Sequence, residues 1–231
     1  ALPISSITDH TGALKGTVRV AGGMTVCLYV FPPLLKHLKK VHPQLDVRLM
    51  VASAGRSVEE IRAGRVDAGL LTLPVEESDL VTVPVLREEL LLVAMPTHPL
   101  ARKRVVRPAD LTGQPFVLFE PGSATRRVID AFFLTERIEP TIVMETENVE
   151  IIKAMVKTGL GIGIVPYQAI AREVRGGQFF CARIEGHELL RETGWVYARA
   201  GRVPRVVNEL MTAFEQIRGR LLLAPRGASR R

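Results

Sequence analysis

The chain has 231 residues, of which 47% are hydrophobic and 24% are charged, and its formal net charge is +7. This composition is typical of a globular protein with one large or two small domains, and it excludes the disordered class. The longest plain apolar stretch, Leu90 to Pro96, is far shorter than the roughly 18 residues needed to cross a bilayer. Because no secretory signal leads the sequence, we expect a cytoplasmic protein without a membrane partner.

Two further features limit the function. The cysteines, Cys27 and Cys181, lie far apart, which favours buried free thiols, although a redox pair stays open. The basic residues are scattered, aromatic residues make up only 5%, and no zinc-finger spacing is present, so direct contact with nucleic acid is not expected. The terminal cluster of Arg226, Arg230 and Arg231 is interpreted as part of a flexible basic tail.

The first part of the chain alternates strands and helices. Strands are predicted over Gly16–Gly22, Asp46–Ala52 and Val66–Leu71, and helices over Val26–Val41 and Ser57–Ala63, the latter with Ser57 as its N-cap. Short connections between such elements predict right-handed crossovers and a parallel sheet.

The pattern then restarts. Strands are predicted over Leu86–Met95, Pro115–Phe119, Thr141–Glu145, Gly159–Pro166 and Glu192–Ala198, with helices over Ala124–Glu136, Val149–Thr158 and Pro204–Ile217. The last helix is expected to cover the first half, which is still one helix short. The chain would therefore pass from one lobe to a second and back, through two crossing strands that form a hinge beside a cleft.

Six short motifs occur in one order along the chain. They are Gly16-Thr17-Val18-Arg19-Val20, Phe31-Pro32 with Leu34-Leu35, His42-Pro43, Val66-Asp67-Ala68-Gly69-Leu70, His98-Pro99-Leu100-Ala101, and the run Gly159–Pro166 (GLGIGIVP). Each motif alone is weak, but together, in this order and spacing over about Gly16–Ile217, they resemble the effector-binding domain of LysR-type transcriptional regulators.

The resemblance implies an α/β fold of the type 2 periplasmic-binding-protein kind, with two Rossmann-like lobes joined by crossing hinge strands. Residues 1–15 would be the remainder of a linker, 16–87 and 199–220 lobe I, 88–198 lobe II, and 221–231 the basic tail. It also implies a homodimer of side-by-side antiparallel subunits, which becomes a tetramer in the full-length protein. DNA would be bound only by an N-terminal winged helix-turn-helix, which this sequence lacks.

The candidate effector site follows from the strand ends. Open α/β sheets bind ligands beyond the carboxyl ends of their strands, where helix N-termini favour anions. The residues at those positions are Met24, Thr25, Val26, Ser53, Gly55, Thr72, Ser123, Thr125, Arg126, Glu147 and Asn148. Thr25 and Asn148 are also candidate helix caps, and Arg126 is a candidate charge partner. These side chains suit a small anion, with a carboxylate as the first choice.

Enzymatic functions are poorly supported. Ser123 lies in PGSAT and not in a GxSxG elbow, and the histidines show no metal-ligand spacing, so we expect no catalytic residue, metal or cofactor. The glycines of Gly159–Gly163 favour close packing over a phosphate loop. The alternatives are a periplasmic solute-binding protein, which shares the fold, and more distantly an enzyme of this fold using Glu120 and Glu147.

Overall fold

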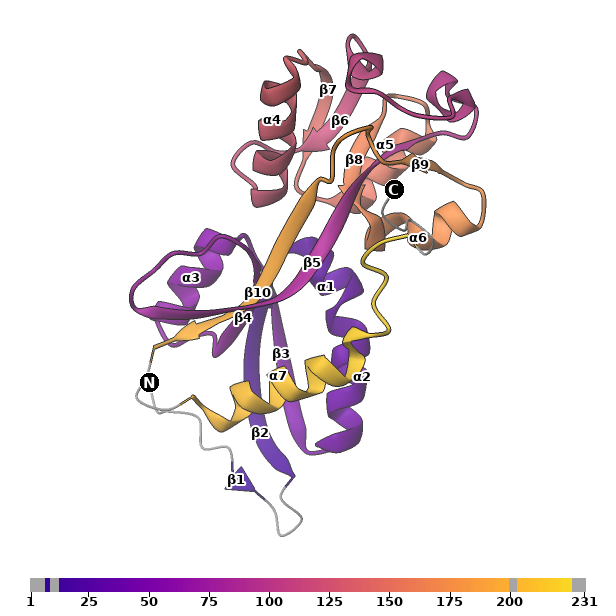
Figure 1. Cartoon of the computed structure of the whole chain (residues 1–231). Coiled ribbons are helices and arrows are strands. Elements are labelled where there is room, and N and C mark those ends of the chain that lie inside the picture. Colours follow the sequence, from indigo (N-terminus) through magenta and orange to yellow (C-terminus); the bar gives the residue numbers. More distant parts are fainter. Residues whose placement is uncertain (1–6, 9–12, 200–202, 226–231) are drawn as a thin grey trace. The chain divides into compact units, whose positions relative to one another are not determined.

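The computed structural model describes residues 7–8, 13–199 and 203–225, and it divides into two compact units (Figure 1). Unit 1 comprises Ala1–Leu86 and Glu192–Leu221, and unit 2 comprises Arg87–Arg191 and Leu222–Arg231. Two strands, β5 (Leu80–Ala94) and β10 (Leu190–Ala198), each contain residues of both units. None of the helices in the described ranges is both long and apolar enough to span a bilayer.

Unit 1 is built around strand β2 (Leu14–Gly22). This strand pairs in parallel with β3 (Leu45–Val51) and β4 (Ala68–Thr72), which confirms the parallel arrangement predicted for the first three strands. Strand β10 runs antiparallel to β4, and the short β1 (Ile7–Thr8) runs antiparallel to β2. The sheet is therefore mixed, because β1 and β10 run antiparallel to their neighbours while β2, β3 and β4 run parallel.

The helices of unit 1 are α1 (Met24–Tyr29), α2 (Phe31–Val41), α3 (Ala54–Arg62) and α7 (Arg205–Arg218). The prediction of one continuous helix over Val26–Val41 is wrong, because this segment holds two helices that meet at Val30. Pro32 and Pro33 explain the break. Proline lacks an N–H and is tolerated in the first turn of a helix, so a helix starts at Phe31.

The two faces of the sheet in unit 1 are covered by different helices. Ala21, Leu71 and Val196 pack with Val58 and Ile61 of α3 in one cluster. Because neighbouring residues of a strand point to opposite faces, Trp195 lies on the other face. There its fully buried ring contacts Phe31 of α2 and Phe214 of α7, at centroid distances of 6.4 and 6.2 Å.

The start of α3 differs from the prediction. Ser53 is the N-cap and its hydroxyl oxygen accepts the N–H of Arg56, whereas Ser57 lies inside the helix. Ser57 is fully buried, and its hydroxyl has no hydrogen-bond partner among the described residues. Both serines precede an apolar helical pattern, so the sequence alone does not separate them, and the shift of four residues keeps the same helix face inward.

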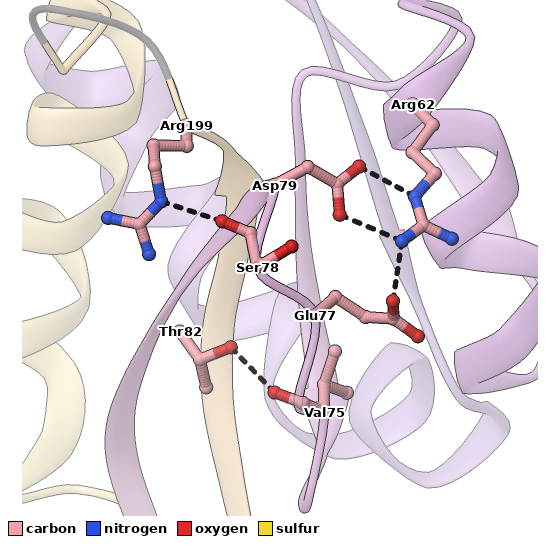
Figure 2. Close-up of polar contacts among 7 residues, drawn as sticks. All are labelled: Arg62, Val75, Glu77, Ser78, Asp79, Thr82 and Arg199. Carbon is pink, nitrogen blue, oxygen red and sulfur yellow. Dashed lines mark hydrogen bonds and ion pairs between the residues drawn. The ribbon is translucent and has the colours of Figure 1, made fainter.

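The connection between β4 and β5 is fixed by arginines from elsewhere in unit 1 (Figure 2). Arg62 of α3 donates to both carboxylate oxygens of Asp79, at 2.7 and 2.8 Å, and to Glu77 at 2.5 Å. Arg199, just after β10, donates to the carbonyl of Ser78 at 3.0 Å. The loop is therefore tied to α3 on one side and to the end of β10 on the other.

Unit 2 contains two groups of strands. Strand β5 pairs antiparallel with β8 (Gly163–Pro166) and β9 (Phe180–Ala182), while β6 (Pro115–Phe119) pairs in parallel with β7 (Thr141–Thr146). The helices are α4 (Ala124–Glu136), α5 (Val149–Lys157) and α6 (Tyr167–Arg175), with 3-10 turns at Pro99–Arg102 and Pro108–Leu111. The bounds of β6 and α4 are those predicted. Strand β5 begins six residues before its predicted start, and α6 and β9 were not predicted.

The glycine-rich run before β8 is explained by close packing, as expected. A Cβ on Gly161 would lie 2.6 Å from the carbonyl oxygen of Pro115, and one on Gly163 would lie 3.1 Å from Ile152 of α5. Gly161 must be small because Ile162 exchanges hydrogen bonds with the β6 backbone, donating to Pro115 and accepting from Val117. The glycine-rich run therefore packs against β6 and is hydrogen-bonded to it. This packing explains the glycines without a bound phosphate.

The expected linker and basic tail fall largely outside the described residues, including Arg226, Arg230 and Arg231. Within the described part, the carbonyl of Leu223 accepts the N–H of Glu89 at 3.1 Å. This bond attaches the residues that follow α7 to strand β5 in unit 2.

Candidate functional site

The turns predicted for unit 1 gather at one edge of its sheet. Gly22 of β2 lies opposite Val51 of β3 and Leu70 of β4, and the N–H of Ala52 donates to the carbonyl of Gly22 at 3.0 Å. The three parallel strands therefore end together. The segments that follow them, which carry Met24 to Val26, Ser53 with Gly55, and Thr72, lie at this common edge.

The turn after β2 differs from the prediction in one respect. Gly23 is the N-cap of α1 and makes no side-chain cap, so the expected capping by Thr25 is wrong. Thr25 lies inside the helix with only 6% of its surface exposed, and Val26 belongs to the core. Met24 is half-buried at the start of the helix. Thr25 thus keeps its hydroxyl available, because the helix start does not use it as a cap.

Gly55 is exposed near the start of α3, and a Cβ added there would meet no atom within 4 Å. It has no positive φ angle, so neither packing nor a tight turn in this protein requires glycine at this position. Thr72 is half-buried at the end of β4, paired with Thr193 of β10. Both residues stay candidates for ligand contact.

The turns predicted for unit 2 also lie together. Phe119, the last residue of β6, pairs with Thr146 of β7, and the N–H of Glu120 donates to the carbonyl of Thr146 at 3.2 Å. The turn from Ser123 to Arg126 and the turn of Glu147 and Asn148 follow these paired strand ends. The hydroxyl oxygen of Ser123 caps α4 by accepting the N–H of Arg126 at 3.1 Å.

Asn148 caps α5, as predicted. Its side-chain oxygen accepts the N–H of Glu150 at 2.9 Å, and its own N–H donates to the hydroxyl of Thr146 at 3.2 Å. Glu147 is exposed beside it. Two helix starts in unit 2 therefore open toward the same strand edge, each capped by a neutral side chain.

Arg126 is engaged by the protein itself. Its side chain is buried and donates to the carbonyl of Phe119 at 2.7 Å, to Glu145 at 2.6 Å and to Asp130 at 2.7 Å. Burial disfavours the charge, but the hydrogen bonds to Glu145 and Asp130 outweigh it and raise the pKa of Arg126 above its ordinary value. Arg126 therefore holds the end of β6 to α4.

A second buried arginine was not found from the sequence. Arg191, at the start of β10, is 4% exposed and donates through Nε and Nη2 to one oxygen of Glu88 at 3.2 and 2.7 Å, and through Nη1 to the hydroxyl of Thr125 at 3.0 Å. Glu88 of β5 is 1% exposed. We call these three residues the Arg191 cluster. All three belong to unit 2.

A weak signal for the Arg191 cluster exists in the sequence. Glu88 and Glu89 directly precede the apolar run of β5, and charged residues are almost never fully buried unless paired. Glu89 pairs with Arg183, again in unit 2, so each buried carboxylate has its own arginine. The sequence shows that partners are needed, but it does not say which of the 31 basic residues supply them.

The cysteines occupy poorly reactive environments. Burial raises the pKa of the Cys27 thiol to about 11, and its sulfur donates to the carbonyl of Gly22. Burial, with a smaller contribution from Glu89, also raises the pKa of Cys181. Since the thiolate is the reactive form, both thiols are disfavoured as redox groups at neutral pH. Within the described residues, no group of three or more His, Cys, Asp and Glu is arranged to hold a metal.

The fold and the turns at the strand ends are typical of ligand-binding proteins. Comparison with known families shows which family the chain belongs to. The family model described as the LysR substrate binding domain matches residues 11–218, and the chain belongs to this family. This confirms the resemblance found in the sequence. The match does not favour a periplasmic solute-binding protein, the alternative interpretation of the same fold.

A curated relative is also a transcriptional regulator. The chain is 24% identical over 194 residues to the HTH-type transcriptional regulator CysL of Bacillus subtilis, covering 84% of this chain and 65% of CysL. The chain thus spans less than two thirds of that relative.

Two solved structures share the fold. The effector-binding domain of QuiR in complex with shikimate has a TM-score of 0.77 and 17% identity, covering 89% of this chain and 98% of QuiR's. The CcmR regulatory domain of Synechocystis PCC6803 in complex with 2-PG has a TM-score of 0.79 and 22% identity, covering 88% and 97%. Both show the fold expected from the sequence, the type 2 periplasmic-binding-protein fold.

Proposed function

We propose that this chain is the effector-sensing part of a cytoplasmic LysR-type transcriptional regulator and has no catalytic activity. It binds a small anionic metabolite at the strand-end turns, and binding alters how a winged helix-turn-helix elsewhere in the protein contacts DNA. Family membership over residues 11–218 is the observation that carries this proposal. QuiR and CcmR were solved with small molecules bound, which supports a ligand for this chain too.

The site geometry supports an anion. In unit 2, α4 and α5 begin at paired strand ends, and the first N–H groups of a helix carry partial positive charge with no partner inside the helix. The hydroxyl of Thr125 adds an uncharged donor at this edge of unit 2, and those of Thr25 and Thr72 offer the same chemistry at the strand edge of unit 1. A ligand can regulate only by binding one arrangement of the protein better than another.

A thermal-shift screen of small carboxylates, sugar phosphates and inorganic anions tests the binding site. A ligand present at 100 times its dissociation constant adds about 2.7 kcal/mol to the free energy of unfolding and raises the midpoint. We expect Thr25→Ala and Thr125→Ala to reduce this shift. Thr135→Ala is the matched control, because Thr135 lies near the other end of α4, exposed, with its hydroxyl bound to the carbonyl of Ala131.

A shift that survives both substitutions would place the ligand elsewhere. With the full-length protein, the same ligand should change its affinity for operator DNA in a gel-shift titration. Turnover of the ligand, followed by mass spectrometry, would instead support the enzyme alternative.

The second part of the proposal is a homodimer. Strand β3 pairs only with β2 among the described residues and exposes Leu49 (39%) and Val51 (50%), while β7 pairs only with β6 and exposes Ile142 (38%) and Val143 (43%). Each unit therefore has an unpaired, partly apolar strand edge, which proteins normally cover. A second copy of the chain would cover such an edge, and two-fold symmetry would make the contact reciprocal.

Helix α7 does not offer an apolar face to this interface. Val206, Val207, Leu210, Phe214 and Ile217 are all buried, so this face covers the sheet of unit 1.

Sedimentation velocity measures the dimer directly. We expect Leu49→Lys with Val51→Lys to convert the dimer to monomer, because buried unpaired lysines are costly. Val105→Lys is the control, since Val105 is equally exposed (45%) but lies on neither edge. A wild-type protein that sediments as a monomer at high concentration would contradict this part of the proposal.

A further inference from the structure

The Arg191 cluster has hydrogen-bonding capacity that the described residues do not fill. A guanidinium group has five N–H hydrogens. Arg191 uses three of them, two toward Glu88 and one toward Thr125, although the residue is 4% exposed. The remaining two hydrogens have no acceptor among the described residues. Buried donors are normally paired, so an acceptor from outside the described residues is expected beside Arg191.

Glu88 shows the complementary deficit. Both bonds from Arg191 go to its oxygen Oε2, while Oε1 is buried and has no hydrogen-bond partner in the described part of the chain. A buried carboxylate oxygen without a donor is unfavourable. The cluster therefore lacks one donor as well as an acceptor.

The neighbouring carboxylate, Glu89, does not share this deficit. Glu89 is also buried, but its two oxygens each accept a hydrogen bond from Arg183, one through Nε and one through Nη2. Successive residues of a strand point to opposite faces, so the two pairs lie on different sides of β5. The fold can satisfy a buried glutamate here, and at Glu88 it leaves one oxygen open.

Thr125 links the Arg191 cluster to the predicted site. It is the second residue of α4, in the turn capped by Ser123, and is 5% exposed. Its oxygen accepts from Arg191, and no acceptor for its own hydrogen is found in the described residues, so the hydroxyl is free to donate. The first N–H groups of α4 point out of the same turn. Thr125, Arg191 and the helix start thus offer donors, and Glu88 offers an acceptor.

We propose that the Arg191 cluster recognises a hydroxy acid, a ligand with a carboxylate and a hydroxyl close together. The carboxylate accepts from Thr125, the start of α4 and the free N–H groups of Arg191, and the hydroxyl donates to Oε1 of Glu88. The charges of Arg191 and Glu88 cancel, so the helix start supplies the remaining positive potential, which suits a single negative charge. This inference rests on the proposed sensing function and names its ligand class.

The test uses matched triplets of monocarboxylic acids that differ at one carbon: lactate, pyruvate and propionate; glycolate, glyoxylate and acetate; 3-hydroxybutyrate, acetoacetate and butyrate. Titration calorimetry gives the dissociation constant for each. In at least one triplet, we expect the hydroxy acid to bind at least about tenfold more tightly than the keto and unsubstituted acids, because a hydrogen bond to a charged group is lost in both.

Glu88→Gln should reverse part of this preference. Arg191 can only donate, so the amide oxygen of the introduced glutamine faces it and the NH₂ group takes the place of Oε1. The variant then offers a donor where the wild type offers an acceptor, and the keto acid should bind more tightly than the hydroxy acid. Glu89→Gln is the matched control, with the same change one residue along β5, and it should keep the wild-type order.

Two outcomes would overturn the inference. One is a set of triplets in which no hydroxy acid binds preferentially, and the other is a Glu88→Gln variant that folds and keeps the wild-type order. If that variant does not fold, the inference is tested with Thr125→Val and Thr125→Ser instead. The valine variant lacks the hydroxyl and should lose affinity for the hydroxy acid by about tenfold or more, whereas the serine variant keeps the hydroxyl and should keep the affinity. The sensing function is judged separately by the broader screen, since a ligand of another class would support sensing and contradict this inference.

Discussion

Replacing Arg191 by methionine is expected to destabilise the protein by about 3–5 kcal/mol, because Glu88 would be left buried without its partner. The side chains are 4% and 1% exposed, so solvent compensates only weakly for the lost ion pair. Urea denaturation followed by circular dichroism measures the change as a lower midpoint. Glu88→Leu alone should also be destabilising, since it leaves the guanidinium unpaired.

The double variant separates pairing from packing. With both charges removed, Arg191→Met and Glu88→Leu together should recover much of the lost stability, because apolar replacements of a buried ion pair are often neutral or better. Losses that simply add would show that the two side chains stabilise the fold independently. Arg107→Met is the control for the substitution, because Arg107 is exposed and its pair with Glu185 lies at the surface.

Gly161→Ala is the second large effect that we expect. The added Cβ would lie 2.6 Å from the carbonyl oxygen and 3.0 Å from the carbonyl carbon of Pro115. Both are backbone atoms of a paired strand, so no side chain can rotate to relieve the contact. Overpacking of this kind costs typically about 1–3 kcal/mol and occasionally more, and thermal or urea unfolding would show it.

Gly219→Ala is the appropriate comparison for Gly161→Ala. Gly219 ends α7 with φ −64°, and a Cβ there would meet no atom within 4 Å. We expect no loss of stability, and up to about 1 kcal/mol of gain from restricting the unfolded chain. Equal effects of the two substitutions would contradict the close packing of Gly161 on β6.

The sequence predicted most elements because local signals agreed with the fold. In α4, a serine cap, an apolar face and a following turn all specify the same bounds, Ala124–Glu136. Where two local signals competed, the prediction failed. Ser57 and Ser53 are both plausible caps, and burial of Ser57 decides between them. Helix α6 was missed although Tyr167, Ile170, Ala171 and Val174 have helical spacing, because the apolar run of β8 leads directly into it.

The candidate site was predictable only in its local parts. Ser123 and Asn148 follow strands and precede helices, so their capping roles can be read from a few neighbouring residues. The Arg191 cluster joins positions 103 and 66 residues apart, and such pairings depend on how distant strands and helices come together. Arg126 illustrates the same limit: its position suggested a ligand contact, while its acceptors Glu145 and the carbonyl of Phe119 become visible only in the folded chain.

Trp195 gives the protein a built-in spectroscopic reporter. It is the chain's only tryptophan and is fully buried in unit 1, against Phe31 and Phe214. Its fluorescence therefore follows the unfolding of unit 1, whereas far-ultraviolet circular dichroism follows the helices of both units. If the two signals give different midpoints, the units unfold in separate steps. Changes in the Arg191 cluster would then move the dichroism transition assigned to unit 2 and leave the fluorescence transition in place.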